Sequence, residues 1–200
     1  MRLKAFGKNE PVFHVEDKAP EIYCLVDGVA LISVVHPIAG QLAAQVLYPG
    51  DWFGEPAALG RRPRLASVIA RGLCQVVSVT QEATDRIVRS DWRFAKSFFD
   101  LMANNAETYM LHGIDLLIQD PKVRLCSRLL TLAGRKVNEW PVAPATIPLS
   151  QDEVALASCL SRKTVNKLLG DLVAKGICEL RYREIRILDV EALVRLQGAG

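Results

Sequence analysis

The residues best suited to specific chemistry lie between positions 150 and 167. Ser150 is followed three positions later by Glu153, which is the spacing of a capping box, where each side chain satisfies a backbone N–H at the start of a helix. Ser161 can cap a second helix that begins at Arg162. The sequence therefore predicts two short helices joined by a tight turn.

The second of these helices has two unlike faces. Apolar residues recur at helical spacing along one side and predict a buried stripe. This stripe comprises Val165, Leu168, Leu169, Leu172 and Val173. The polar residues of its first two turns are Arg162, Lys163, Thr164, Asn166 and Lys167. Side chains of these types near the start of a helix donate hydrogen bonds to base edges in the major groove of DNA. A plain helical hairpin with a solvated charged face is the alternative.

A basic hairpin is expected beyond this helix. Gly176 ends the helix, and two runs rich in β-forming residues, 177–180 and 185–188, flank Arg181 and Arg183. Arginines at a hairpin tip bind phosphates, which adds affinity that depends on salt but not on sequence. Two short helices followed by such a hairpin are typical of a winged helix-turn-helix.

Length and composition are those of a soluble globular protein. The 200 residues are 50% hydrophobic and 24% charged, which excludes a disordered tail, a collagen and a disulfide-rich miniprotein. Residues 119–200 contain 13 of the 25 basic and 9 of the 22 acidic side chains, so the net charge of +3 comes from the C-terminal part. The N-terminus lacks an apolar signal segment, and turn formers interrupt the uncharged stretch 28–50. We therefore expect a cytoplasmic protein without membrane contact.

Other elements must position the two short helices. Short runs of β-branched and aromatic residues, separated by turn formers, predict an antiparallel β barrel or sandwich over residues 11–80. A helical pattern over residues 91–118 corresponds to a rod of roughly 40 Å. Pro121 disfavours helical geometry at Asp120 and suits the first turn of a new helix. A domain boundary is therefore predicted at residue 119.

The predicted long helix exceeds what a small domain needs for its own core, which favours a dimer seam. The residues expected on this seam are Phe98, Leu101, Met102, Asn105 and Tyr109. Packing against the chain's own domains is the alternative, because polar residues at Asn105, His112 and Asp115 interrupt a clean heptad pattern.

These motifs together resemble the Crp/Fnr family of transcription regulators. The resemblance spans nearly the whole chain and rests on Pro49-Gly50-Asp51-Trp52-Phe53-Gly54-Glu55, on Leu149-Ser150-Gln151-Asp152-Glu153, and on Leu160-Ser161-Arg162-Lys163-Thr164-Val165-Asn166-Lys167. It implies an α+β fold with an N-terminal β jelly-roll (double-stranded β-helix) sensor over residues 1–90, a dimerisation helix over 91–118 and a winged helix-turn-helix over 119–200. It further implies a bacterial homodimer that reads a palindromic promoter site with helix 162–174 and acts with RNA polymerase.

The resemblance also assigns the residues that read bases. It places Arg162, Lys163 and Lys167 at the base-reading positions, and Ser150, Ser161, Arg181 and Arg183 in the same DNA-binding surface. Many relatives have Glu where Lys163 stands and Arg where Lys167 stands. Glu accepts a hydrogen bond from cytosine and Lys cannot, so we expect a half-site that differs from the common one of the family.

An effector pocket in the β-rich half is implied as well. In relatives that bind cyclic nucleotides, a Gly-Glu pair and an Arg-Ser pair hold the ribose and the cyclic phosphate. Gly54, Glu55 and Arg64 match this pattern, but Leu65 stands at the Ser position and Tyr109 falls at a position that contacts adenine. The loss of these donors predicts a regulator that does not depend on cyclic AMP. The alternative to ligand binding is that Arg64 only pairs with Glu55 or with other acidic groups.

No cofactor, metal site or enzymatic activity is expected. Only Cys24 precedes Cys74, whereas iron–sulfur relatives need a group of cysteines there, and the three histidines are isolated. No common catalytic motif is present. Cys159, in the turn between the two short helices, is a candidate for redox control as well as for simple packing. The alternative function is a sensor whose barrel binds a non-nucleotide effector, or responds to redox state, and gates the DNA-binding half.

Overall fold

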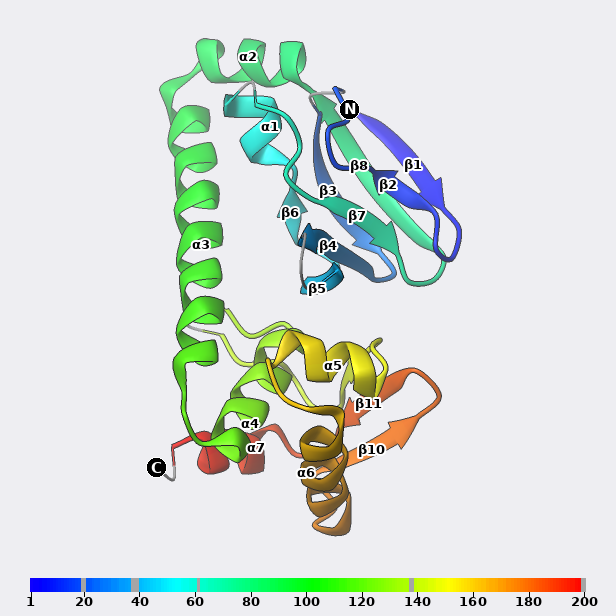
Figure 1. Cartoon of the computed structure of the whole chain (residues 1–200). Helices are drawn as coiled ribbons and strands as arrows, with labels where there is room; N and C mark the ends of the chain where they lie inside the picture. Colours follow the sequence, from blue (N-terminus) through cyan, green and yellow to red (C-terminus); the bar gives the residue numbers. More distant parts are fainter. Residues whose placement is uncertain (19–20, 37–39, 61, 137–138, 199–200) are drawn as a thin grey trace. The chain divides into compact units, whose positions relative to one another are not determined.

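The structure is a computed structural model of the whole chain (Figure 1), and it describes all residues except 19–20, 37–39, 61, 137–138 and 199–200, together with the side chains of His36 and Gln41. The described residues form two compact units. The first comprises residues 1–41 and 47–106, and the second comprises residues 42–46 and 107–200. The strand β5 (Gly40–Leu47) and the long helix α3 (Trp92–Leu117) contribute residues to both, and each unit is described by itself.

The N-terminal strands form two four-stranded sheets, with the orders β1-β8-β3-β6 and β2-β7-β4-β5. Both sheets pair strands that are distant in sequence, such as β1 with β8, as in a jelly-roll. Besides β5, the strands are β1 (Arg2–Phe6), β2 (Pro11–Phe13), β3 (Glu21–Asp27), β4 (Ala30–His36), β6 (Trp52–Phe53), β7 (Ser67–Ala70) and β8 (Cys74–Thr80). The predicted α+β fold with a β-rich N-terminal half is confirmed.

The interior of the first unit is built from alternate residues of these strands. In β7, and in β8 as far as Ser78, buried residues alternate with partly exposed ones, which places one face of each strand in the core. Three aromatic rings meet there: the Tyr23 ring lies 5.5 Å from that of Phe13 and 5.5 Å from that of Phe53, between centroids. Strands far apart in the sequence therefore share one aromatic cluster.

The first unit also contains helical segments. They are α1 (Glu55–Gly60), α2 (Gln81–Ser90) and the first part of α3. Thr80 caps α2 by accepting a hydrogen bond from the backbone N–H of Ala83 at 3.3 Å. The helix α3 agrees within one residue at each end with the helix predicted over 91–118. No helix in the described part of the chain is long and apolar enough to cross a membrane.

The second unit combines helices with a small sheet (Figure 1). Its helices beyond α3 are α4 (Pro121–Leu132), α5 (Gln151–Ala157), α6 (Arg162–Ala174) and α7 (Val190–Gln197). Asp120 caps α4 by accepting from the N–H groups of Lys122 and Val123, each at 2.8 Å, and Pro121 stands at the first turn. The predicted helix break at Pro121 is confirmed. Leu125, Leu129 and Leu130 of α4 are fully buried in the core of this unit.

The sheet of the second unit has the order β10-β11-β9. The strands β10 (Cys178–Arg181) and β11 (Glu184–Ile187) form the expected hairpin. The strand β9 (Ala145–Ile147) pairs with the other edge of β11, so that Ile147 lies opposite Ile185. This third strand was not predicted. It ties the hairpin to the segment that leads into α5.

Candidate nucleic-acid interface

The helix α5 begins with the predicted capping box. The Ser150 backbone N–H donates to Glu153 Oε2 at 2.7 Å, and the Glu153 N–H donates to Ser150 Oγ at 3.2 Å. Two backbone donors that the helix itself leaves unpaired are thereby satisfied. Ser150, predicted to be part of the DNA-binding surface, has its hydroxyl engaged in this cap.

A tight turn, residues 158–160, connects α5 to α6. Its middle residue, Cys159, adopts a left-handed backbone conformation with φ +51° and exposes its thiol. The turn is held by hydrogen bonds from the Leu160 N–H to the Ala155 carbonyl at 3.0 Å and from Arg124 Nη1 to the Cys159 carbonyl at 3.3 Å. The angle between α5 and α6 is therefore fixed by backbone contacts as well as by packing.

Ser161 caps α6 as predicted. Its hydroxyl oxygen accepts from the Thr164 N–H at 3.1 Å and lies 2.8 Å from the Thr164 hydroxyl. Ser161 and Thr164 were both predicted to lie in the DNA-binding surface, and the structure places them together at the start of α6. Their first role is to fix the turn that carries Arg162 and Lys163.

The helix α6 has the two predicted faces. Val165, Leu169 and Leu172 are buried, whereas Arg162, Lys163, Asn166 and Lys167 are exposed. The prediction that Val173 is buried was wrong, because it lies eight positions after Val165 and falls at the edge of the apolar stripe, in contact with solvent. The cationic end of the helix is thus presented to solvent by a firmly packed apolar face.

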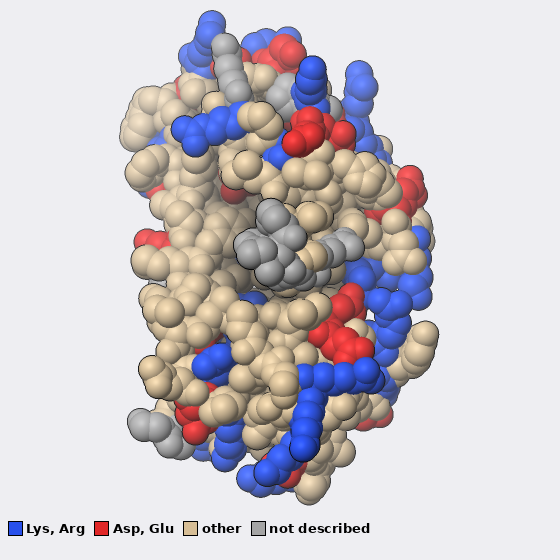
Figure 2. Space-filling view, viewed as in Figure 1, with Lys and Arg blue, Asp and Glu red and all other residues tan. Residues whose placement is uncertain are grey.

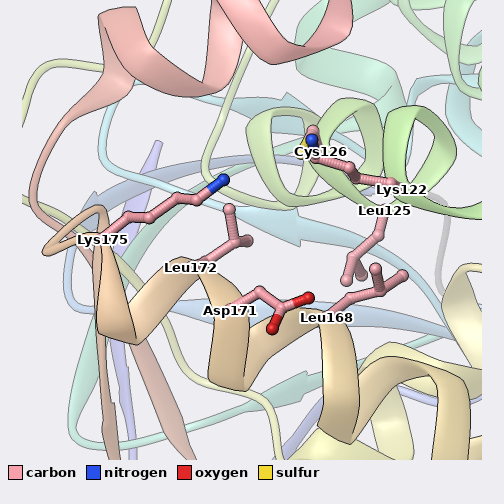
Figure 3. A pocket seen from close by; sticks show the side chains of 7 residues that line it. All are labelled: Lys122, Leu125, Cys126, Leu168, Asp171, Leu172 and Lys175. Atoms are coloured by element: carbon pink, nitrogen blue, oxygen red, sulfur yellow. The ribbon is translucent and has the colours of Figure 1, made fainter.

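On its packed side α6 rests against α4. Figure 3 shows Leu168 and Leu172 pointing toward α4, which carries Leu125 and Cys126. A cavity of about 80 Å³ remains between the two helices. It is lined by Lys122, Leu125, Cys126, Leu168, Asp171, Leu172 and Lys175. Burial raises the pKa of the Cys126 thiol to about 11, so this cysteine stays protonated at neutral pH.

The hairpin tip is tighter than predicted. Arg181 and Glu184 lie opposite each other in the strands, which leaves Tyr182 and Arg183 as a two-residue turn instead of the four residues expected. Arg183, the second residue of this turn, has φ +55°, in the left-handed region. Arg181, Tyr182 and Arg183 are all exposed. Two predicted phosphate-binding side chains are therefore brought to one hairpin end.

Carboxylates accompany three of these arginines, and the sequence reasoning missed them. Arg162 Nε lies 2.9 Å from Asp152 Oδ1, and Arg183 Nη2 lies 3.8 Å from Glu153 Oε1. Arg181 donates from Nε and Nη2 to the two carboxylate oxygens of Glu179, each at 3.2 Å, which raises the pKa of this arginine. In Figure 2, acidic and basic side chains lie beside one another on the surface of the same part of the molecule.

A buried polar cluster fills the interior behind this surface. Asp115 of α3 accepts from the hydroxyls of Ser127 and Thr131, each at 2.6 Å, and lies 3.5 Å from the guanidinium of Arg135. Arg128 of α4 donates to the Ala157 carbonyl at the end of α5 at 3.0 Å. Sequence reasoning treated Asp115 only as an interruption of a heptad, although an acidic residue on an otherwise apolar helix face signals a buried partner.

The predicted effector residues of the first unit are partly brought together. Arg64 is only 3% exposed and donates from Nη1 to the Gly54 carbonyl at 3.0 Å and from Nη2 to the Glu21 carbonyl at 2.8 Å. Its guanidinium also stacks 3.9 Å above the Phe13 ring. Leu65, by contrast, is 82% exposed. Both terminal nitrogens of Arg64 are therefore engaged by backbone carbonyls of the same unit.

Gly54 and Glu55 complete this inner site. Gly54 has φ +87°, and a Cβ added there would lie 2.6 Å from Arg64 Nη1, so only glycine permits the close approach. Glu55 is buried and accepts from Asn105 Nδ2 of α3 at 2.8 Å. Tyr109 belongs to the second unit, where its ring meets that of His112 edge-on at 6.3 Å between centroids.

The predicted dimer-seam residues occupy different faces of α3. Met102 and Tyr109 are exposed, Phe98 and Leu101 are partly buried, and Asn105 is bound to Glu55 and to the Trp52 carbonyl of its own chain. Further large apolar side chains are exposed along the helix. They are Trp92, Phe94 and Phe99 in the first unit and Met110, Ile114 and Leu117 in the second.

The five cysteines are free thiols. Within the part of the chain that the structure describes, no group of three or more His, Cys, Asp or Glu residues is arranged to hold a metal ion.

Comparison with known families and proteins matches both units. A family model described as a cyclic nucleotide-binding domain matches residues 3–91, and one described as a Crp-like helix-turn-helix domain matches residues 123–196. The transcriptional regulator LdrP of Thermus thermophilus is 25% identical over 99% of this chain and 98% of its own length. A CRP-like cAMP-activated global transcriptional regulator of Mycobacterium tuberculosis is 26% identical over 95% of this chain and 85% of its own. The structure of FixK2 from Bradyrhizobium japonicum superposes with a TM-score of 0.79 at 20% identity, covering 100% of this chain and 98% of that one.

Proposed function

The chain belongs to the Crp/Fnr family of transcription regulators, and from this premise we propose that it binds a palindromic promoter site as a homodimer, without cyclic AMP. The observation that carries the proposal is α6, a capped helix whose apolar face is buried and whose first two turns expose Arg162, Lys163, Asn166 and Lys167. These side chains are the donors that read base edges in the major groove.

The remaining predicted contacts have a different role in this proposal. Arg181 and Arg183 at the hairpin end bind phosphates, which sets the register of the protein on the duplex without reading its sequence. Ser150 and Ser161 fix the two helices by capping them, as their hydrogen bonds support. The C-terminal residues 119–200 thus act as the DNA-binding domain, residues 1–90 as the sensor domain and residues 91–118 as the dimerisation helix.

A homodimer is proposed because α3 exposes large apolar side chains on both of its halves. Exposed aromatic and aliphatic side chains on one helix mark a protein–protein contact. A two-fold axis along this helix would present two copies of α6 to DNA, and half-sites about 34 Å apart, one helical turn, would make the target a palindrome. RNA polymerase is the further partner that we infer, since the proposed site is a promoter.

Independence from cyclic AMP is supported by Arg64. The arginine that would bind the cyclic phosphate donates instead to the carbonyls of Gly54 and Glu21 and is covered by the Phe13 ring. A phosphate there would meet a buried guanidinium whose two terminal nitrogens already donate to backbone carbonyls, and Leu65 supplies no hydroxyl in compensation. The Mycobacterium tuberculosis relative is described as cAMP-activated, so the two proteins are a direct experimental contrast.

Selection of bound sequences from random DNA tests the proposal. The purified protein, without added ligand, should enrich a palindromic sequence, and Arg162→Ala or Lys167→Ala should each lower affinity for it about 10- to 100-fold. Analytical ultracentrifugation should give a dimer, and cyclic AMP should change neither the melting temperature nor the DNA affinity. Enrichment only in the presence of cyclic AMP, or binding by a monomer, would contradict the proposal.

Control by redox state is the second candidate, and the exposed thiol of Cys159 favours it. The thiol stands in the turn that sets the angle between α5 and α6, so an oxidised sulfur would add bulk and charge close to the DNA phosphates. DNA affinity measured before and after mild peroxide, with Cys159→Ser as the control, distinguishes this candidate. A loss of affinity that Cys159→Ser prevents supports redox control, and an unchanged affinity excludes it.

A further inference from the structure

We propose that Asp152, in the first turn of α5, determines the specificity of DNA recognition. In this role Asp152 holds Arg162 in the geometry that reads a base. Its negative charge also lowers the affinity for DNA of any other sequence. The inference rests on the proposed function, because it assumes that Arg162 reads a base. Asp152 itself is a positioning residue that acts through Arg162.

The ion pair joins two helices whose positions are fixed independently. Asp152 Oδ1 lies 2.9 Å from Arg162 Nε, between side chains that are 56% and 72% exposed. The start of α5 is held by the capping box at Ser150, and the start of α6 by the hydroxyl of Ser161. Val165, in the first turn of α6, is fully buried, which also anchors this end of the helix. The carboxylate therefore presents a fixed acceptor to the first residue of α6.

Because the contact is at Nε, Asp152 can position Arg162 while Arg162 remains able to bind a base. A guanidinium has five N–H donors, and the closest approach of Asp152 is to Nε, which carries one of them. The other four belong to the terminal nitrogens, which donate as a fork to O6 and N7 of guanine. Holding Nε limits the rotation of the long side chain, so less conformational entropy is lost when the fork meets a base.

The charge of Asp152 has a second effect. Sequence-independent affinity grows with the number of phosphates that Lys and Arg neutralise, and a carboxylate at the interface opposes it. Three of the five cationic residues in the predicted DNA-binding surface, Arg162, Arg181 and Arg183, have a carboxylate within 4 Å. These carboxylates repel the DNA phosphates. The repulsion therefore weakens binding when the protein lies on the wrong sequence, out of the correct register.

Asp152 is the member of this acidic set that a variant can test. Glu153 also approaches an arginine, but its carboxylate accepts the Ser150 N–H in the capping box, so its removal would loosen α5. Asp152 is exposed and takes no part in that cap. The variant Asp152→Asn keeps the size of the side chain and should leave the melting temperature within a few degrees of the wild type, since an exposed ion pair contributes little stability.

Fluorescence anisotropy with two duplexes provides the test: the selected palindrome and a scrambled sequence of the same composition, each measured over a range of salt concentrations. Asp152→Asn should raise affinity for the scrambled duplex about 5- to 10-fold and steepen its logarithmic salt dependence by about one unit. The ratio of specific to non-specific affinity should fall about tenfold, and Asp152→Glu should restore it. The matched control is Asp171→Asn, which removes an exposed carboxylate from a later turn of α6 and should leave the ratio within about twofold.

Two results would overturn the inference. If Asp152→Asn changes the ratio and the salt dependence no more than Asp171→Asn does, Asp152 has no positioning role, although the proposed function stands. If Arg162→Ala leaves the ratio of the wild type unchanged, the base-reading role of Arg162 fails and this inference fails with it. In the Arg162→Ala background, Asp152→Asn should lower the ratio by less than it does in the wild type, because positioning acts through Arg162 and only the charge effect remains.

Discussion

The two units use arginine in opposite ways. In the first unit Arg64 is buried against Phe13, and its terminal nitrogens donate to backbone carbonyls of the same chain. In the second unit Arg162 is exposed at the start of a capped helix and touches Asp152 through Nε. A buried guanidinium that donates to its own backbone stabilises a fold, whereas an exposed one with a carboxylate on one side remains able to recognise another molecule. The match of Arg64 to a ligand-binding motif is therefore weaker evidence of function than the exposure of Arg162.

Replacing Arg64 tests the structural side of this comparison and should have the largest effect. Arg64→Met keeps much of the volume but leaves the Gly54 and Glu21 carbonyls without their donors, so we expect a loss of about 3 kcal/mol in the free energy of unfolding. Urea denaturation measures this loss. Arg62→Met, at an exposed arginine two residues earlier, is the matched control and should change the free energy by less than about 0.5 kcal/mol. Equal effects of the two variants would show that the buried contacts of Arg64 contribute no stability.

Changing the chemistry of one exposed cation sharpens the functional side. Lys163→Glu replaces a donor by an acceptor at the second residue of α6. Sequences selected by this variant should carry cytosine at one position of each half-site, where the wild type prefers another base, with a discrimination of about 2 kcal/mol. Lys175→Glu, at the other end of the same helix, makes the same charge change and should weaken binding without changing the selected base. An unaltered preference in Lys163→Glu would remove Lys163 from the base-reading set.

What the sequence predicted correctly is local. The caps at Ser150 and Ser161, the helix break at Pro121 and the helices that follow them depend on residues within one helical turn, so spacing alone reveals them. The features that the sequence did not reveal depend on contacts through space. The strand β9 exists because Ile147 pairs with Ile185, 38 positions later by the register of the sheet, and no local pattern encodes that pairing.

The candidate site divides in the same way. The exposed cationic face of α6 follows from helical periodicity and was predicted. The carboxylate beside Arg162 lies ten positions earlier on another helix, so only the crossing of α5 and α6 brings it close. The inward direction of Arg64, in the loop before β7, depends on Phe13 of β2 and Glu21 of β3. The sequence therefore shows which residues carry charge, but not which of these charged groups are already paired within the folded chain.

Measuring stability at several pH values tests whether the stability of the second unit, like that of the first, depends on buried ionisable groups. Burial, together with nearby Arg128, lowers the pKa of His112 to about 4, so this histidine is neutral in the folded protein. The unfolded chain takes up a proton below about pH 6.5, so stability is highest above that pH. Between pH 6.5 and 5 the free energy of unfolding should fall by about 1 kcal/mol per pH unit.

Urea denaturation at several pH values measures this dependence. His112→Gln should flatten it, whereas His14→Gln, at an exposed histidine of the first unit, should leave it as in the wild type. The same slope in all three proteins would mean that His112 does not control the acid sensitivity.

Helix caps allow the closest comparison between the units, with the smallest expected effect. Ser161 caps α6 in the second unit and Thr80 caps α2 in the first, each by accepting from a backbone N–H three residues later. Ser161→Ala and Thr80→Ala should each cost about 1 kcal/mol in the free energy of unfolding, because each leaves that donor without its partner. Only Ser161→Ala should also weaken binding to the selected palindrome, by about threefold to tenfold, since the frayed first turn carries Arg162 and Lys163. Equal DNA affinities in the two variants would mean that the order of this turn does not matter for recognition, and that exposure of the cations alone distinguishes the second unit from the first.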